Sequence, residues 1–129
     1  LMRLPDMIAK RKARRRQYEE FFSNMRGVSM MPGNIEEDNC WLSSILVDSS
    51  VSGWSSGELR QHLETVNIES RPLWKPMHLQ PLYQDSPVFG GEVAERLFST
   101  GLALPSGSAL SDADMNRILQ TVSDFVETR

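Results

Sequence analysis

The segment NCWLSSILVD (39–48) constrains the fold of this chain more than any other part of its sequence. Successive side chains of a strand point to opposite faces, and here both alternating sets are apolar or small. The two sets are Trp41, Ser43, Ile45 and Val47 on one face, and Cys40, Leu42, Ser44 and Leu46 on the other. This composition is typical of a strand that is covered on both faces. We therefore predict a buried strand over 39–48 inside a layered α/β fold.

Two long helices are predicted towards the ends of the sequence. Residues 2–24 have helical spacing on one face, and Gly27 with MMPGN (30–34) predicts a loop after them. The apolar positions of this first face are Leu4, Met7, Ile8, Tyr18, Phe21 and Phe22. A C-terminal amphipathic helix is predicted after Ser111, an N-cap residue that is followed by two aspartates. Its apolar positions are Met115, Ile118, Leu119, Val122, Phe125 and Val126.

Two shorter helices are predicted in the middle of the chain. Ser55 and Glu58 have the spacing of a capping box, which predicts a helix over about 56–66. The buried edge of this helix is formed by Leu59, Leu63 and Val66. A further helix is predicted over 91–99, and we expect it to bury Val93, Ala94, Leu97 and Phe98.

The remaining segments complete the predicted fold. Residues 67–74 are expected to be extended, residues 77–84 to form a short helix, and residues 101–105 to form a short apolar strand closed by proline. The whole chain then forms one domain of the α/β (α+β) class. It has a small, roughly three-stranded sheet packed with helices, a long N-terminal helix and a C-terminal amphipathic helix.

The composition argues against several classes of protein. No apolar run approaches the roughly 20 residues that a membrane-spanning helix needs. The first sixteen residues lack the apolar core of a secretory signal. A single cysteine, Cys40, cannot form an internal disulfide and indicates a reducing compartment, so we expect a cytoplasmic protein.

Two histidines without a CxxC pair predict no metal site. Cys40 also has no recognisable activating base, which favours a buried side chain over a nucleophile.

The charge is distributed unevenly along the chain. Residues 1–16 carry a local charge of +6, and the remainder carries −9. The basic block 10–16 has two interpretations, a phosphate-binding surface for nucleic acid and the solvated face of a long helix. The second is favoured, because the rest of the chain is acidic and only one aromatic side chain, Tyr18, lies near the block.

The segment ESRPLWKPMHLQPLY (69–83) is the candidate site. Its three prolines stiffen the backbone and bias the preceding residues away from helical geometry. Its cations, Arg71, Lys75 and His78, form a set suited to a phosphate-bearing ligand. Trp74 and Tyr83 offer flat surfaces for a base or a sugar ring. The alternative is a proline-rich connection whose aromatic rings pack on the core and whose cations cap carbonyls, and spacing alone leaves both open.

The string IESRPLWKPMHLQPLY (68–83) resembles a signature of the C-terminal small domain of the DegT/DnrJ/StrS family. These are pyridoxal-phosphate-dependent nucleotide-sugar aminotransferases of the aspartate-aminotransferase fold, fold type I. MRLPDMIAKRKARRRQYEEFF is similar to a helix of that family, NCWLSSILVD to its Asn-x-Trp-Leu strand, and LALPSGSALSDADMNRIL to the stretch before its final helix. The resemblance covers essentially the whole chain.

The resemblance implies that residues 1–129 are the small domain of a longer enzyme whose large cofactor-binding domain is absent here. The complete enzyme would move an amino group from glutamate, through pyridoxal phosphate, to a 4-keto-6-deoxy nucleotide sugar for surface polysaccharide or glycan synthesis. This chain alone is expected to be inactive and to bind no cofactor. Lys75 matches a small-domain position and not the Schiff-base lysine. The domain is expected to form a homo-oligomer and to bind neither nucleic acid nor membrane.

Carried over onto this sequence, the family motif assigns substrate contacts to Arg71, Trp74, Lys75 and His78. Asn39 and Trp41 are assigned to the same cleft. No catalytic or metal-binding residue is expected. Two rival hypotheses remain, a free-standing module that uses the basic helix 10–16 to bind nucleic acid or an acidic partner, and a folded remnant without a ligand.

Overall fold

The computed structural model describes residues 2–129 of the chain. The elements in chain order are α1 (Leu4–Phe22), β1 (Val28–Met30), β2 (Ser43–Val47), α2 (Ser49–Ser52), α3 (Ser56–Thr65), β3 (Arg71–Pro72), the 3-10 helices η1 (Met77–Leu79) and η2 (Pro81–Tyr83), α4 (Glu92–Thr100), β4 (Gly101–Leu104) and α5 (Asp112–Glu127). The predicted α/β class is confirmed. None of the helices in this part of the chain is long and apolar enough to cross a bilayer.

The sheet is antiparallel and has the strand order β1-β2-β4-β3. It therefore has four strands, one more than the sequence predicts, because Val28–Met30 is a strand and not part of a loop. This strand of three residues is too short to show a period in the sequence. It is positioned by Gly27, whose φ of +75° suits glycine and whose carbonyl accepts a hydrogen bond of 2.7 Å from the backbone N–H of Asp48.

Strand β2 begins at Ser43, four residues later than the sequence predicts. The side chain of Asp38 accepts a hydrogen bond from the backbone N–H of Cys40, and Asn39 accepts one from Trp41. These local turns compete with strand pairing. Cys40 has a φ of +50°, which a strand does not allow, although its side chain is buried as expected.

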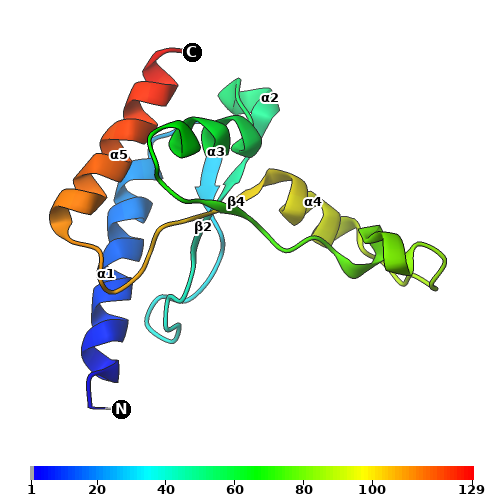
Figure 1. The fold of residues 1–129 in the computed structure, drawn as a ribbon, viewed down its shortest axis with the longest axis horizontal. Helices are drawn as coiled ribbons and strands as arrows, with labels where there is room; N and C mark the ends of the chain where they lie inside the picture. Colours follow the sequence, from blue (N-terminus) through cyan, green and yellow to red (C-terminus); the bar gives the residue numbers. More distant parts are fainter. Residues whose placement is uncertain (1) are drawn as a thin grey trace.

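The core lies where α1, α3 and α5 pack against one face of the sheet (Figure 1). The register pairs Ile45 with Leu102 and Ser43 with Leu104, so these side chains share that face. The largest fully buried apolar side chains are Tyr18, Ile45, Leu59, Leu63, Leu102, Met115, Val47 and Val122. Capping boxes are present at both predicted helix starts, Ser55 with Glu58 on α3 and Ser111 with Asp114 on α5.

Residues 75–95, here called the arm, project from the rest of the domain (Figure 1). The predicted helix over 77–84 is two 3-10 turns, because Pro81 cannot donate the hydrogen bond that a continuous helix needs. Helix α4 forms as predicted, but none of its residues is buried. Val93 is 60% exposed and Ala94 is exposed too, so their predicted burial was wrong. This end of α4 lies on the arm, away from the sheet.

Candidate functional site

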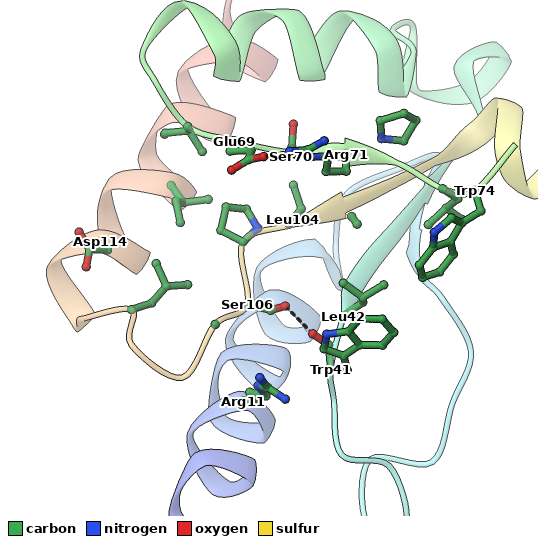
Figure 2. Close-up of a pocket in the computed structure, with 18 of the residues that line it drawn as sticks. Arg11, Trp41, Leu42, Glu69, Ser70, Arg71, Trp74, Leu104, Ser106 and Asp114 are labelled. Carbon is green, nitrogen blue, oxygen red and sulfur yellow. Dashed lines mark hydrogen bonds and ion pairs between the residues drawn. The ribbon is translucent and has the colours of Figure 1, made fainter. Parts of the chain in front are cut away.

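A cavity of about 880 Å³ lies between α1, the start of α5, β3 and the loop that follows β4 (Figure 2). Four of the six residues that the sequence nominates line it. These are Trp41, Arg71, Trp74 and Lys75. The walls between them are largely apolar and include Leu42, Leu104 and Ile118. The remaining two nominated residues, Asn39 and His78, do not line the cavity.

Two exposed indole rings form one side of the cavity mouth. Trp41 and Trp74 are 60% and 71% exposed, and their ring centroids lie 6.1 Å apart with the planes tilted by 41°. Two neighbouring aromatic rings are seldom left this exposed, because each ring loses the stabilisation that burial of its large apolar surface would give. The pair is therefore suited to take a flat ring against its faces.

Asn39 acts on the cavity through Trp41. Its Oδ1 accepts a hydrogen bond of 2.9 Å from the backbone N–H of Trp41. On the other side, the hydroxyl of the buried Ser106 donates to the carbonyl of Trp41 over 3.3 Å. These two contacts hold the backbone that presents the Trp41 ring.

Arg71 and Lys75 supply positive charge to the same cavity. Arg71 lies on β3, opposite Ala103, and its guanidinium pairs with Glu69; the Nε contact measures 2.8 Å. This pair is exposed, so an anionic ligand can displace the glutamate at little cost. The Lys75 side chain is exposed and has no acidic partner among the residues that the structure describes.

His78 lies on the arm, where its imidazole is held on two sides. Nε2 lies 2.8 Å from Oε1 of Glu95. Gly91 packs against the ring so closely that a Cβ there would lie 2.8 Å from Cε1. The side chain is only 19% exposed. The direct substrate contact assigned to His78 stays a prediction, and the geometry gives this residue a place in holding the arm.

The basic block on α1 is used inside the molecule. Three of its cations form ion pairs: Lys10 with Asp6, Arg15 with Glu19 and Arg16 with Glu36. Lys12 donates a hydrogen bond to the carbonyl of Glu36. Arg14 forms an ion pair with Asp112 and donates to the carbonyl of Leu110. Helix α1 therefore binds the 34–38 loop and the start of α5 with its cations. This arrangement favours the structural interpretation of the block over nucleic-acid binding.

Arg11 lines the cavity although the sequence motif does not nominate it. It lies on α1 and borders the cavity on the side of Trp41 and Ser106 (Figure 2). The helical spacing places Arg11 on the apolar face of the first helix. A cation on an apolar face is unusual, and this pattern could have identified Arg11 as a candidate site residue. Ser70, on the β3 side of the cavity, lies within the 68–83 string but is not among the residues to which the resemblance assigns a contact.

Burial and hydrogen bonding set the charge states around the site. Burial, with Asp38 as the second cause, raises the pKa of the Cys40 thiol, so the thiol is a poor nucleophile at neutral pH. Hydrogen bonds from Ser111 lower the pKa of Asp114, which stays charged at the cavity edge. Among the described residues, no group of three His, Cys, Asp or Glu side chains is arranged to hold a metal ion.

Comparison with known proteins places these features in a family. Residues 1–123 match the model of the DegT/DnrJ/EryC1/StrS aminotransferase family. EpsN of Bacillus subtilis (strain 168), which is named as a pyridoxal phosphate-dependent aminotransferase, is 32% identical over 130 residues, covering 97% of this chain and 33% of that protein. A GDP-perosamine synthase of Escherichia coli O157:H7 is 33% identical over 85 residues, covering 66% of this chain and 22% of that protein.

Solved structures give the same result for the fold. The crystal structure of a DegT DnrJ EryC1 StrS aminotransferase from Brucella abortus matches with a TM-score of 0.77 and 29% identity, over 97% of this chain and 32% of that one. The aminotransferase TlmJ from Streptoalloteichus hindustanus matches with a TM-score of 0.85 and 21% identity, over 98% and 34%. The chain thus spans about a third of the length of these proteins.

Proposed function

Because the chain belongs to the DegT/DnrJ/EryC1/StrS aminotransferase family, we propose that it forms one wall of the nucleotide-sugar site of a longer aminotransferase. The complete enzyme would transfer an amino group from glutamate to a keto carbon of a 4-keto-6-deoxy nucleotide sugar. Relatives named GDP-perosamine synthase, from Caulobacter vibrioides, Escherichia coli and Vibrio cholerae, support a nucleotide-linked sugar as the substrate. The product would serve the synthesis of surface polysaccharide or glycan.

The observation that carries this proposal is the exposed pair Trp41 and Trp74 beside Arg71 and Lys75 in one cavity. A volume of about 880 Å³ lies within the range of small-molecule sites. The indole faces can stack on a base or sugar ring. Arg71 presents a planar fork that matches phosphate oxygens, and Lys75 adds a point charge. The walls of the cavity exclude water from one side of the bound ligand.

The chain's own lysines do not fit a covalent pyridoxal phosphate site. A Schiff-base lysine is desolvated or set beside another cation, so that it can react as the neutral amine. Lys10 is in an ion pair with Asp6, Lys12 donates to the carbonyl of Glu36, and Lys75 is exposed. We therefore assign cofactor binding to the rest of the longer protein. Bound there, the cofactor would supply the electron sink for transamination.

Within this proposal each residue of the cavity has a binding or positioning role. Trp41 and Trp74 bind the ring, while Arg71 and Lys75 bind the anionic part of the ligand. Asn39 positions Trp41 through its backbone. His78 holds the arm, which begins at Lys75. None of these side chains is assigned a step in bond making or breaking.

We test the proposal by titrating the 129-residue chain with guanosine, uridine and thymidine diphosphates in a calorimeter. We expect one of them to bind, and the W41A/W74A double variant to lose most of the affinity, because each stacked ring contributes roughly 1 kcal/mol or more. V51A is the control, since Val51 is an exposed apolar residue of α2, outside both the cavity and the arm. Equal binding by W41A/W74A and by the parent chain would remove the indole pair from the site.

We also propose that the domain self-associates through the arm. Its exposed apolar side chains are Met77, Leu82, Val88, Phe89 and Val93. Such a group on a projecting segment favours contact with a second copy of the chain. Sedimentation should show a dimer or a weak oligomer that L82S/F89S reduces to monomer. A parent chain that stays monomeric at high concentration would contradict this.

A further inference from the structure

We propose that Arg11 binds a phosphoryl oxyanion of the ligand in the cavity, an inference that rests on the proposed function and extends it to a residue on another element. Arg11 comes from α1, far in sequence from the 69–83 segment that nominated the site. It enters the same cavity from the side of Trp41 (Figure 2).

The contrast between Arg11 and its neighbours on α1 is the first observation. Each of the other cations of the basic block has a carboxylate or carbonyl acceptor; these are Lys10, Lys12, Arg14, Arg15 and Arg16. Arg11 has no acceptor among the described residues, and of the cations in this block it alone lines the cavity. Its Nε is shielded from solvent and carries a proton that finds no partner.

An unpartnered Nε–H on a charged side chain is unfavourable unless a ligand in the cavity supplies a hydrogen-bond acceptor. A guanidinium cannot release its proton in a protein, so Arg11 stays charged in a partly buried position. A buried donor without a partner is unfavourable, and more so when it belongs to a charged group. Arg14 Nε is unpartnered too, but the other nitrogens of that group bind Asp112 and Leu110.

A second unpartnered group lines the same cavity. The hydroxyl of Ser70 is buried and has no hydrogen-bond partner. Figure 2 shows Ser70 on the β3 side and Arg11 on the α1 side, with the Trp41 ring near Arg11. Of the four buried side-chain atoms without a partner in residues 2–129, these two belong to residues that line this cavity. A polar ligand with several acceptor oxygens matches both.

The surrounding charges favour an anion. Arg11, Arg71, Lys75 and Arg117 line the cavity, against two carboxylates, Glu69 and Asp114. Glu69 is paired with Arg71, and Asp114 accepts hydrogen bonds from Ser111. The excess of cations and the fork of Arg11 suit a phosphate, which can accept two parallel hydrogen bonds from one guanidinium.

The test compares Arg11 with Arg16, a cation of the same helix that pairs with Glu36 outside the cavity. Inorganic pyrophosphate, guanosine diphosphate, guanosine and glutamate are titrated separately into the parent chain, R11M, R11K and R16M. Methionine keeps an unbranched stem against the cavity wall, and lysine keeps the charge without the fork. The melting temperature of each variant shows whether it is folded.

We expect R11M to weaken pyrophosphate and guanosine diphosphate by about tenfold or more, the scale of a lost charge-assisted hydrogen bond. R11K should lie between R11M and the parent, and R16M should stay within about twofold of the parent, because an exposed ion pair away from the ligand contributes little. Guanosine, which lacks phosphate, should bind R11M and the parent alike.

The other outcomes separate the two proposals. Equal affinity of R11M and the parent for both phosphates would overturn the role of Arg11 and leave the nucleotide site standing. If pyrophosphate binding depends on Arg11 and guanosine diphosphate binds no more tightly than pyrophosphate, the role of Arg11 stands and a guanosine nucleotide is excluded as the ligand. Dependence on Arg11 for glutamate alone would overturn the phosphoryl assignment. Binding of none of the four would overturn the role of Arg11 and would exclude a guanosine nucleotide as the ligand. If R11M does not fold, R11K decides between these outcomes.

Discussion

The imidazole Nε2 of His78 and the carboxylate Oε1 of Glu95 lie 2.8 Å apart, although 17 residues separate them in the chain. The contact joins η1 to α4 and closes the arm on itself. Since His78 is largely buried and does not line the cavity, the arm and the cavity are separate features that meet near Trp74 and Lys75. Changes in the arm can therefore be tested apart from changes in the cavity.

Removing the His78 side chain should loosen the arm and leave the core intact. We expect H78A to raise hydrogen exchange over residues 77–95, because the imidazole joins the two sides of the arm. The melting temperature should change little, since none of these residues belongs to the hydrophobic core. E92Q is the control, because Glu92 is an exposed residue of α4, the helix that carries Glu95. Unchanged exchange in H78A would show that the contact does not hold the arm.

A methyl group at Gly91 should displace His78. Gly91 has a φ of +116°, and a Cβ there would lie 2.8 Å from the imidazole Cε1. We expect G91A to cost about 1–3 kcal/mol of local stability in the arm and to reproduce the exchange pattern of H78A. G90A is the matched control, because Gly90 also has a positive φ, of +69°, but open space around its Cβ position. Equal effects of G90A and G91A would assign the loss to backbone conformation alone.

The phenol of Tyr18 should hold the loop that forms one wall of the cavity. Its hydroxyl donates a hydrogen bond of 2.7 Å to the carbonyl of Pro105, and burial raises the pKa of this phenol. We expect Y18F to lower the free energy of unfolding by about 1–2 kcal/mol, because the carbonyl loses its partner. Y83F, on a half-buried ring of the arm, is the control. Chemical denaturation measures both, and a Y18F curve that coincides with the parent would contradict the prediction.

Acid should destabilise the domain through Glu58. Hydrogen bonds from the backbone and hydroxyl of Ser55, and then from Arg129, lower the pKa of Glu58 from 4.5 to about 2. A carboxyl group whose pKa is lower in the folded state than in the unfolded state stabilises the fold at any pH above the unfolded-state pKa. This stabilisation is lost as the pH falls from the unfolded-state pKa through the folded-state pKa. The melting temperature should therefore fall between about pH 4.5 and pH 2. Asp48 and Asp114, whose pKa values are also lowered, add to the same fall.

The variant E58Q isolates this contribution. Glutamine fits the same position of a capping box but does not titrate. We expect E58Q to have a lower melting temperature than the parent at neutral pH and a shallower fall in acid. E64Q, on an exposed side chain of the same helix, should follow the parent. Parallel curves for E58Q and the parent would show that Glu58 does not drive the acid response.

Local signals in the sequence predict the elements whose causes are local. The capping residues at Ser55 and Ser111 predict the starts of α3 and α5, because the residues that satisfy each helix end lie within three positions of it. The C-terminal helix also buries the predicted Met115, Ile118, Val122 and Phe125. Strand β1 escapes prediction because it depends on pairing with β2 and not on its own pattern.

The site is harder to predict than the fold. Arg71, Trp74 and Lys75 are close in sequence and can be found together, but Arg11 reaches the cavity only because α1 packs beside the loop after β4. Likewise, nothing near His78 in the sequence indicates Glu95 as its partner. Contacts between distant segments decide both cases, and the order of residues alone does not contain them.

Strand β4 is central in the sheet, yet it is the last of the four strands in the chain. On the ribosome, β1 and β2 can pair once residue 47 has left the exit tunnel, but β3 has no partner until Gly101–Leu104 emerges. Helix α5 adds Met115 and Phe125 to the core later still. The nascent domain therefore completes first its sheet and then its core late in synthesis. Chains halted before residue 101 should be cleaved at sites that chains carrying α5 protect.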